Sequence, residues 1–209
     1  MEKRVIVIVG PTASGKTFLS LRLAEKLNSE IISADSRQIY KFLSIGTAKP
    51  SGEELKRIKH HFVDELYPNQ EFNASRFEEE SIRIIKSLHQ KNKLPIVAGG
   101  SGLYMKALVD GIFNSIGRDD EYRKELLKLK DEYGNEYLHE ILMEKDPESA
   151  GNMLPQNWKR VIRALEVFRI SGKPIGELQS DYERKIDFEF LQFGLAWERE
   201  TLYKNIEER

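Results

Sequence analysis

The sequence predicts an α/β fold in which helices flank a parallel sheet and a helical insertion subdomain follows the core. Short β-branched runs alternate with amphipathic helical segments up to about residue 113. A glycine-bounded loop joins the first such run to the first helix. After Phe113 the sequence changes to charged segments with helical periodicity. Strands that alternate with helices are typical of parallel sheets with right-handed crossovers.

Length and composition bound the possible functions. The 209 residues suffice for one sizeable α/β domain with a small appended subdomain. The formal net charge of −1 gives no overall attraction to nucleic acid or to a membrane. The absence of cysteine excludes disulfides, thiolate zinc sites and cysteine nucleophiles. No apolar stretch approaches membrane-spanning length, so we expect a cytoplasmic protein with no membrane partner.

The elements of the core follow from the pattern of apolar residues. Val5–Val9 is a continuous β-branched run, as expected of a strand covered on both faces. The segment from Lys16 to about Leu27 repeats leucine at helical spacing. Further strands are expected at Glu30–Ala34, His61–Leu66, Leu94–Ala98 and Phe188–Leu195. Further helices are expected at 51–59, at Ala74–Gln90, and after GGSGLY through Val109.

The second half of the chain has a helical pattern that sets the limits of the predicted domains. Residues 114–158 contain no convincing buried strand and are typical of two or three charged helices. Trp158–Ile170 is strongly amphipathic and ends at Ser171-Gly172. We therefore expect a core at 1–113, a helical insertion at 114–158 and a return to the core at 159–209. The last residues, TLYKNIEER, have helical character and no stop signal, so we expect the native chain to continue.

The first loop carries the clearest chemical signal. Residues 10–17, GPTASGKT, fit the pattern G-x-x-x-x-G-K followed by Ser or Thr, with a strand before and a helix after. Glycines let several backbone N–H groups turn inward, and the following helix directs its positive end at the same place. Lys16 adds a mobile positive charge, and the Thr17 hydroxyl suits Mg²⁺. The loop predicts a P-loop NTPase-like core that holds a phosphate or diphosphate, but it leaves the reaction open.

Asp35 follows the second predicted strand, at the edge of the sheet where ligands bind in open parallel sheets. Three functional roles compete for its carboxylate: holding magnesium through water, holding an acceptor hydroxyl, or accepting a proton from an attacking amine or hydroxyl. A helix N-cap is the structural alternative. Ser36 and Gln38 suit contact with a flat heterocycle, and they equally suit an ordinary loop.

Several motifs occur in an order that resembles a known family. GPTASGKT, DSRQIY, GTAKP, GGSGLY and RVIRALEV with a following SGK resemble the tRNA dimethylallyltransferases, also called tRNA isopentenyltransferases or IPP transferases. The resemblance extends from Val5 to about Arg209. It implies transfer of a dimethylallyl group from dimethylallyl diphosphate to the N6 amine of the adenosine beside the anticodon in tRNA. Diphosphate is then the leaving group, Mg²⁺ is the cofactor, and we expect a monomer.

The resemblance also implies roles for individual residues. Thr12 corresponds to a threonine that hydrogen-bonds the bridging oxygen, Thr17 to the magnesium ligand, and Asp35 to the aspartate that accepts from the adenine amine. Ser101 corresponds to a hydroxyl residue of the reaction channel. The diphosphate is expected to contact the whole loop, which comprises Gly10, Pro11, Thr12, Ala13, Ser14, Gly15, Lys16 and Thr17.

The implied RNA contacts come from the helical part of the chain. Arg160 and Arg163 resemble arginines near the diphosphate or the RNA backbone; a solvated face or a structural ion pair is the alternative. The insertion at 114–158 resembles the region that grips the anticodon stem-loop, although its charge balance alone favours an ordinary solvated surface. The chain departs from the family pattern in two places: at Pro155-Gln156-Asn157, where the family usually reads P-N-D, and at Asn205, where arginine is common.

Other functions share part of this signature. A small-molecule kinase of the shikimate or nucleoside type also has a phosphate loop, an aspartate after the second strand and a helical lid, and it uses ATP. An isopentenyltransferase acting on free adenine nucleotides is a nearer alternative, but such an enzyme has no need of a long stem-gripping insertion. A non-catalytic phosphate- or RNA-binding module would not need Asp35.

Overall fold

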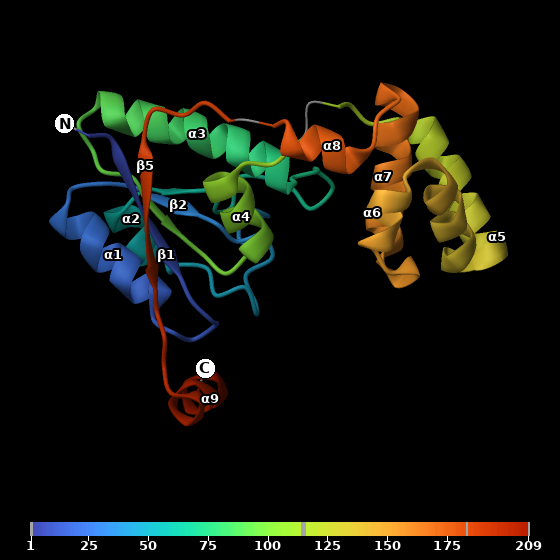
Figure 1. Ribbon diagram of the computed structural model, residues 1–209. Coiled ribbons are helices and arrows are strands. Elements are labelled where there is room, and N and C mark those ends of the chain that lie inside the picture. The colour runs from blue at the N-terminus through green and yellow to red at the C-terminus, as the bar shows by residue number, and fades with distance from the viewer. Residues whose placement is uncertain (1, 114–115, 183, 209) are drawn as a thin grey trace. The chain divides into compact units, whose positions relative to one another are not determined.

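The structure is a computed structural model that describes residues 2–113, 116–182 and 184–208. The chain forms two compact units (Figure 1). Unit 1 comprises Met1–Ile112 and Lys185–Arg209, and unit 2 comprises Phe113–Arg184. Within the described residues, no helix combines the length and the apolar character needed to cross a membrane.

Unit 1 is built on a five-stranded sheet with the order β3-β2-β4-β1-β5, in which neighbouring strands pair in parallel. The strands are β1 (Arg4–Val9), β2 (Ile31–Ser33), β3 (His60–His61), β4 (Ile96–Ala98) and β5 (Glu189–Gly194). This confirms the predicted parallel α/β core. Because all strands run the same way, the loops that follow them meet at one edge of the sheet.

Helices cover both faces of this sheet (Figure 1). Alternate residues of β1 point to opposite faces, so Val5 and Val7 join one apolar cluster while Ile6 and Ile8 join the other. The first cluster packs against α3 (Ala74–Gln90) and α4 (Gly102–Asp110), and the second packs against α1 (Lys16–Lys26). The remaining helices of unit 1 are α2 (Gly52–Arg57) and α9 (Arg199–Glu207).

The predicted third strand is much shorter than expected. The sequence predicted His61–Leu66, whereas β3 contains only His60–His61. Phe62 (φ 64°) and Asp64 (φ 55°) turn the chain out of the strand conformation. Pairing resumes only at an isolated bridge between Tyr40 and Leu66.

Unit 2 is helical, with a core between α5 and α7. Its helices are α5 (Asp120–Lys145), α6 (Pro147–Gly151), the 3₁₀ turn η1 (Pro155–Asn157), α7 (Trp158–Ser171) and α8 (Ile175–Ser180). Gly134, with φ 92°, breaks α5 near its middle, where the sequence predicted a boundary between two helices. Leu138 and Leu142 of α5 and Leu165 of α7 share one buried cluster. Because α7 and α8 belong to this unit, its end lies at Arg184 and not at the predicted position 158.

The turn after β4 lies directly against the end of β2. A Cβ atom on Gly99 would lie 2.2 Å from the carbonyl oxygen of Ala34, which leaves no room for a side chain. The amide of Ser101 donates to the same carbonyl oxygen at 3.0 Å. This close approach places the GGSGLY turn beside the loop that begins at Asp35.

We expect Gly99→Ala to lower the free energy of unfolding by about 2–3 kcal/mol, because the added methyl group forces β4 and β2 apart. Gly100→Ala is the matched control, since a Cβ there has no heavy atom within 4 Å. Urea titration of both variants measures the difference. Equal stability of the two proteins would contradict the close approach.

Candidate active site

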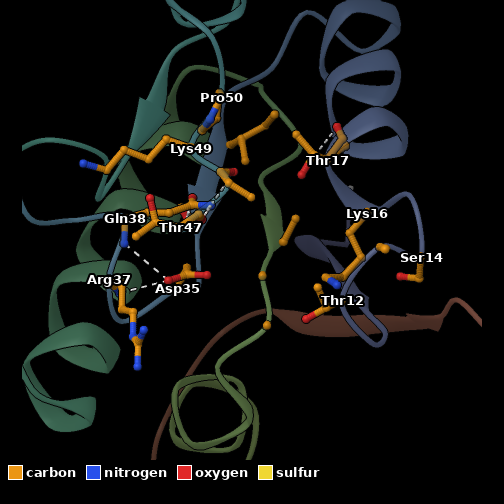
Figure 2. Close-up of a pocket in the computed structure, with 18 of the residues that line it drawn as sticks. Thr12, Ser14, Lys16, Thr17, Asp35, Arg37, Gln38, Thr47, Lys49 and Pro50 are labelled. Atoms are coloured by element: carbon orange, nitrogen blue, oxygen red, sulfur yellow. Dashed lines mark hydrogen bonds between the residues drawn. The ribbon is translucent and has the colours of Figure 1, made fainter. Parts of the chain in front are cut away.

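The carboxyl edge of the sheet in unit 1 holds a cavity of about 580 Å³ (Figure 2). Its walls contain residues from four of the predicted motifs, namely residues 12–17, Asp35 and Gln38, residues 46–50, and Gly99 with Gly100. Figure 2 shows Asp35 on one wall and Thr12, Lys16 and Thr17 on the other. The predicted phosphate loop and the predicted catalytic carboxylate therefore line the same cavity.

The phosphate loop has the backbone conformation that an anion-binding nest requires. Ala13 (φ 61°) and Gly15 (φ 88°) are both left-handed, which curls the chain ahead of α1. Within the described residues, no side chain caps the start of α1, and its first turn carries no acidic residue. The positive end of the helix dipole therefore lies at the phosphate loop without a side-chain cap, where it favours a bound anion.

Two side chains of the loop indicate how a ligand would be held. The Lys16 ammonium donates to the carbonyl oxygens of Gly10 at 2.9 Å and Pro11 at 2.6 Å, so it lies folded over the loop. Ser14 is 3% exposed, and its Oγ has no hydrogen-bond partner among the described residues. A buried hydroxyl without a partner costs about 1–3 kcal/mol, which a phosphate oxygen at this position would offset.

Asp35 is half-buried and uses only one of its carboxylate oxygens to hold its own turn. Oδ1 accepts from the amides of Arg37 at 2.9 Å and Gln38 at 3.3 Å. The carboxylate therefore caps a turn, whereas the structural alternative considered from the sequence was a helix N-cap. Its second oxygen makes no hydrogen bond with the described residues and is free to accept from a substrate.

The predicted contact residues Ser36 and Ser101 join the Asp35 loop to α4. The Ser36 amide donates to Ser101 Oγ at 2.9 Å. Together with the bond from the Ser101 amide to Ala34, this anchors both sides of the aspartate. The structure thus gives Ser101 a positioning contact, in addition to the channel position that the sequence resemblance implies.

Gln38 has its side-chain amide fully engaged within the protein. Its Oε1 accepts from Ser33 Oγ at 2.8 Å, and its Nε2 donates to the carbonyl oxygens of Thr47 and Ala48 at 3.1 and 2.9 Å. These bonds hold the GTAKP loop against β2. The sequence predicted a direct contact between Gln38 and the substrate. The geometry instead favours a role for Gln38 in positioning the GTAKP loop.

Electrostatics single out Asp35 within the cavity. Among the described residues of its lining, Asp35 is the only acidic one, alongside the cations Lys16, Arg37 and Lys49. Lys49 is neutralised in part by an ion pair with Asp64 at 2.6 Å. Burial lowers the pKa of His60, which also lines the cavity, and its hydrogen bond to the Ile58 carbonyl only partly opposes this effect. His60 is therefore neutral at pH 7.

Tyr104 of the GGSGLY segment lies close enough to Asp35 to be influenced by its charge. Burial, followed by the nearby Tyr40 and Asp35, raises the pKa of Tyr104 to about 12. The phenol stays protonated at neutral pH and donates to the Phe72 carbonyl at 3.2 Å. Tyr104 is thus an uncharged hydrogen-bond donor with a structural partner.

The two predicted arginines lie on α7 in unit 2, and they have different environments. Arg163 donates to the carbonyls of Ile116 and Gly117 at 2.9 and 3.0 Å and pairs with Glu166 at 2.7 Å. This favours the structural ion pair that the sequence left open as an alternative. Arg160 is exposed on the same helix.

Glu166 is fully buried at the centre of this ion-pair network. Its own burial raises its pKa, but the hydrogen bonds from Arg123, Arg163 and the Asp119 amide outweigh that effect and hold the pKa of Glu166 below its usual value. A lowered pKa in the folded state stabilises the protein above the pKa of the unfolded chain. This contribution disappears as pH falls through the folded-state value.

We expect Glu166→Gln to destabilise unit 2 by about 3 kcal/mol at pH 7, because two arginines lose their buried partner. The difference in stability from the unaltered protein should narrow as pH falls from the usual glutamate range down through the lowered folded-state pKa of Glu166. Thermal unfolding followed by circular dichroism from pH 7 to pH 3 measures both effects. Glu177→Gln, which removes one partner of an exposed pair with Lys173, is the control; a loss of stability equal to that of the control would contradict the prediction.

Sequence reasoning missed one contact on the phosphate loop. The indole Nε1 of Trp197 donates to the carbonyl oxygen of Ser14 at 3.0 Å. Trp197 follows β5 and therefore emerges at the ligand edge, which was the only sequence signal for it. Asn205 of α9 also lines the cavity, so the departure from the family arginine falls within the site.

Comparison with known proteins identifies the family of the chain. The family model described as IPP transferase matches residues 38–209. A tRNA dimethylallyltransferase of Acetivibrio thermocellus is 47% identical over 98% of this chain and 66% of its own length. One from Finegoldia magna is 44% identical over all of this chain and 67% of its own length. The chain thus spans about two thirds of the curated relatives it matches.

Solved structures give the same result. A tRNA isopentenylpyrophosphate transferase from Bacillus halodurans matches 99% of this chain and 64% of its own, with 36% identity and a TM-score of 0.62. A eukaryotic dimethylallyltransferase described as acting on tRNA matches 99% of this chain and 51% of its own, with 30% identity and a TM-score of 0.84. By its sequence and its fold, the chain belongs to the IPP transferase family.

Proposed function

We propose that this chain forms the catalytic part of a cytoplasmic tRNA dimethylallyltransferase. The reaction transfers the dimethylallyl group of dimethylallyl diphosphate to the N6 amine of the adenosine beside the anticodon and releases diphosphate. The observation that carries the proposal is that the phosphate loop and Asp35 line one cavity, with one carboxylate oxygen free. The family and the names of the relatives support the identity of the two substrates.

The phosphate loop binds the diphosphate and stabilises it as it leaves. When the bond between the allylic carbon and the bridging oxygen breaks, negative charge grows on that oxygen. The hydroxyl of Thr12 is the donor proposed for it, while Lys16 and the amides of the loop hold the terminal oxygens. Donors fixed before the reaction act most strongly where charge develops.

Asp35 orients the nucleophile. The lone pair of an exocyclic adenine amine is delocalised into the ring, so the amine is a weak nucleophile. The free oxygen of Asp35 accepts a hydrogen bond from the amine and takes its proton as the new nitrogen–carbon bond forms. The bonds from Oδ1 to the Arg37 and Gln38 amides keep the carboxylate in place during this step.

The residues present suit Mg²⁺ bound together with the diphosphate. Thr17 lines the cavity at the start of α1, and no group of three or more acidic or histidine side chains in the described part of the chain forms a metal site. Mg²⁺ commonly takes one or two protein ligands and completes its shell with phosphate oxygens and water. Thr17 would hold the ion, which neutralises diphosphate charge when bound.

The segment that precedes the 46–50 wall in sequence carries exposed apolar side chains, which suit contact with an unpaired RNA loop. The target base must leave its stack to reach the cavity. The chain segment that leads into the 46–50 wall displays Phe42, 79% exposed, and Ile45, 99% exposed. Apolar and aromatic side chains are the surfaces on which unstacked bases rest. These exposed apolar side chains support an RNA substrate over the small polar acceptors of the kinase alternative.

Incubation of the purified protein with labelled dimethylallyl diphosphate and bulk tRNA tests the proposal. We expect label on the N6 of adenosine, with one diphosphate released per label and no need for ATP. Parallel reactions contain ATP with shikimate or nucleosides, and labelled donor with free adenine nucleotides. Phosphorylation of an alcohol would favour the kinase, and labelling of free nucleotides but not of tRNA would favour the other isopentenyltransferase.

A further inference from the structure

The segment that follows β5 runs along the outside of the phosphate loop. The Leu195 amide donates to the Val9 carbonyl at 2.8 Å, and the Leu195 carbonyl lies 3.0 Å from where a Cβ of Gly10 would be. Two residues later, the Trp197 indole donates to the Ser14 carbonyl at 3.0 Å. This segment therefore contacts both the start and the middle of the loop.

A loop that turns its amides toward an anion must turn carbonyl oxygens outward, where each needs its own donor. Lys16 supplies that donor for Gly10 and Pro11. Trp197 supplies it for Ser14 from outside the loop. The peptide group that carries the Ser14 carbonyl leads into Gly15, and glycine accepts either sign of φ at little cost. Without a donor this peptide is free to rotate, which would direct a carbonyl oxygen toward the phosphate.

We propose that Trp197 is a positioning residue for diphosphate binding, and that its indole N–H keeps the Ser14–Gly15 peptide in the anion-binding orientation. The inference rests on the proposed function, because it concerns the same loop. Trp197 is 52% exposed, so its ring contributes little to the core. The specific contribution of the side chain is the hydrogen bond to the loop, which an exposed packing residue would not need.

Two variants separate the hydrogen bond from the ring. Trp197→Phe removes the N–H and part of the ring, and replacement of Trp197 by 3-benzothienylalanine removes only the N–H and keeps the shape. We expect each variant to bind inorganic pyrophosphate about 5- to 10-fold more weakly, the range of one neutral hydrogen bond. KM for dimethylallyl diphosphate should rise by a similar factor, while the affinity for tRNA and the melting temperature stay unchanged.

Tyr203→Phe is the matched control. Tyr203 is an aromatic residue of α9 with 51% exposure, and its hydroxyl interacts with Arg199 at 3.3 Å rather than with the loop. Removal of that hydroxyl should leave pyrophosphate affinity unchanged. Unaltered pyrophosphate affinity in the benzothienylalanine protein would overturn the inference and leave the proposed function standing. Failure of the unaltered protein to bind pyrophosphate would contradict the proposed function, and with it the inference.

Discussion

Replacement of Asp35 by asparagine is expected to slow prenyl transfer about 10³-fold in a single turnover, within the range usual for loss of a general base. Asparagine keeps an oxygen that accepts from the Arg37 and Gln38 amides, so the turn is preserved. It loses the negative charge that attracts the proton of the adenine amine. The measurement is a rapid-quench assay with a labelled anticodon stem-loop and saturating donor.

A measurement of pyrophosphate affinity distinguishes the loss of the proton acceptor from a general disturbance of the site. Asp35→Asn should bind pyrophosphate as the unaltered protein does, because its partner is the nucleophile and not the leaving group. Asp35→Ala removes both functions of the carboxylate, and we expect its stability to fall as well because two turn amides lose their acceptor. If the single-turnover rate of Asp35→Asn lies within threefold of that of the unaltered protein, Asp35 is not the proton acceptor.

The second large effect is expected for Thr12→Val, which keeps the size of the side chain and removes its hydroxyl. If Thr12 donates to the bridging oxygen, the single-turnover rate falls about 10²- to 10³-fold, because that donor acts where charge develops. The affinity for RNA should change little. The assay is the same rapid quench, combined with a filter-binding titration of the stem-loop.

Thr12→Ser tests the chemistry of this position, because it retains the hydroxyl. We expect it to recover most of the rate. If Thr12→Val lowers the affinity for pyrophosphate and the rate by the same factor, the loop has collapsed. In that case Thr12 has no special relation to the bridging oxygen.

The sequence predicted those features that depend on local patterns. The β-branched run of β1, the loop at 10–17 and the amphipathic α3 each carry their signal within one short segment. Asp35 was placed correctly at the cavity because the carboxyl ends of parallel strands share one edge. This reasoning depends on the parallel direction of the strands and not on their exact bounds. The error in the predicted length of β3 therefore did not affect it.

Features that depend on contacts between distant segments were not predictable. Gln38 has a polar side chain that suits substrate binding, but its amide group hydrogen-bonds Ser33 and the Thr47 carbonyl. Trp197 reaches Ser14 across 183 positions of sequence. The limit of unit 2 depends on packing between α5 and α7, and neither helix reveals its partner by its own periodicity.

The most direct test is a crystal structure of the protein with a slowly reacting sulfur analogue of dimethylallyl diphosphate. We expect both phosphate groups within the loop at residues 10–17, the bridging sulfur beside Thr12, and the allylic carbon on the side facing Asp35. Diphosphate bound elsewhere, or an allylic chain directed away from the Asp35 carboxylate, would contradict the account.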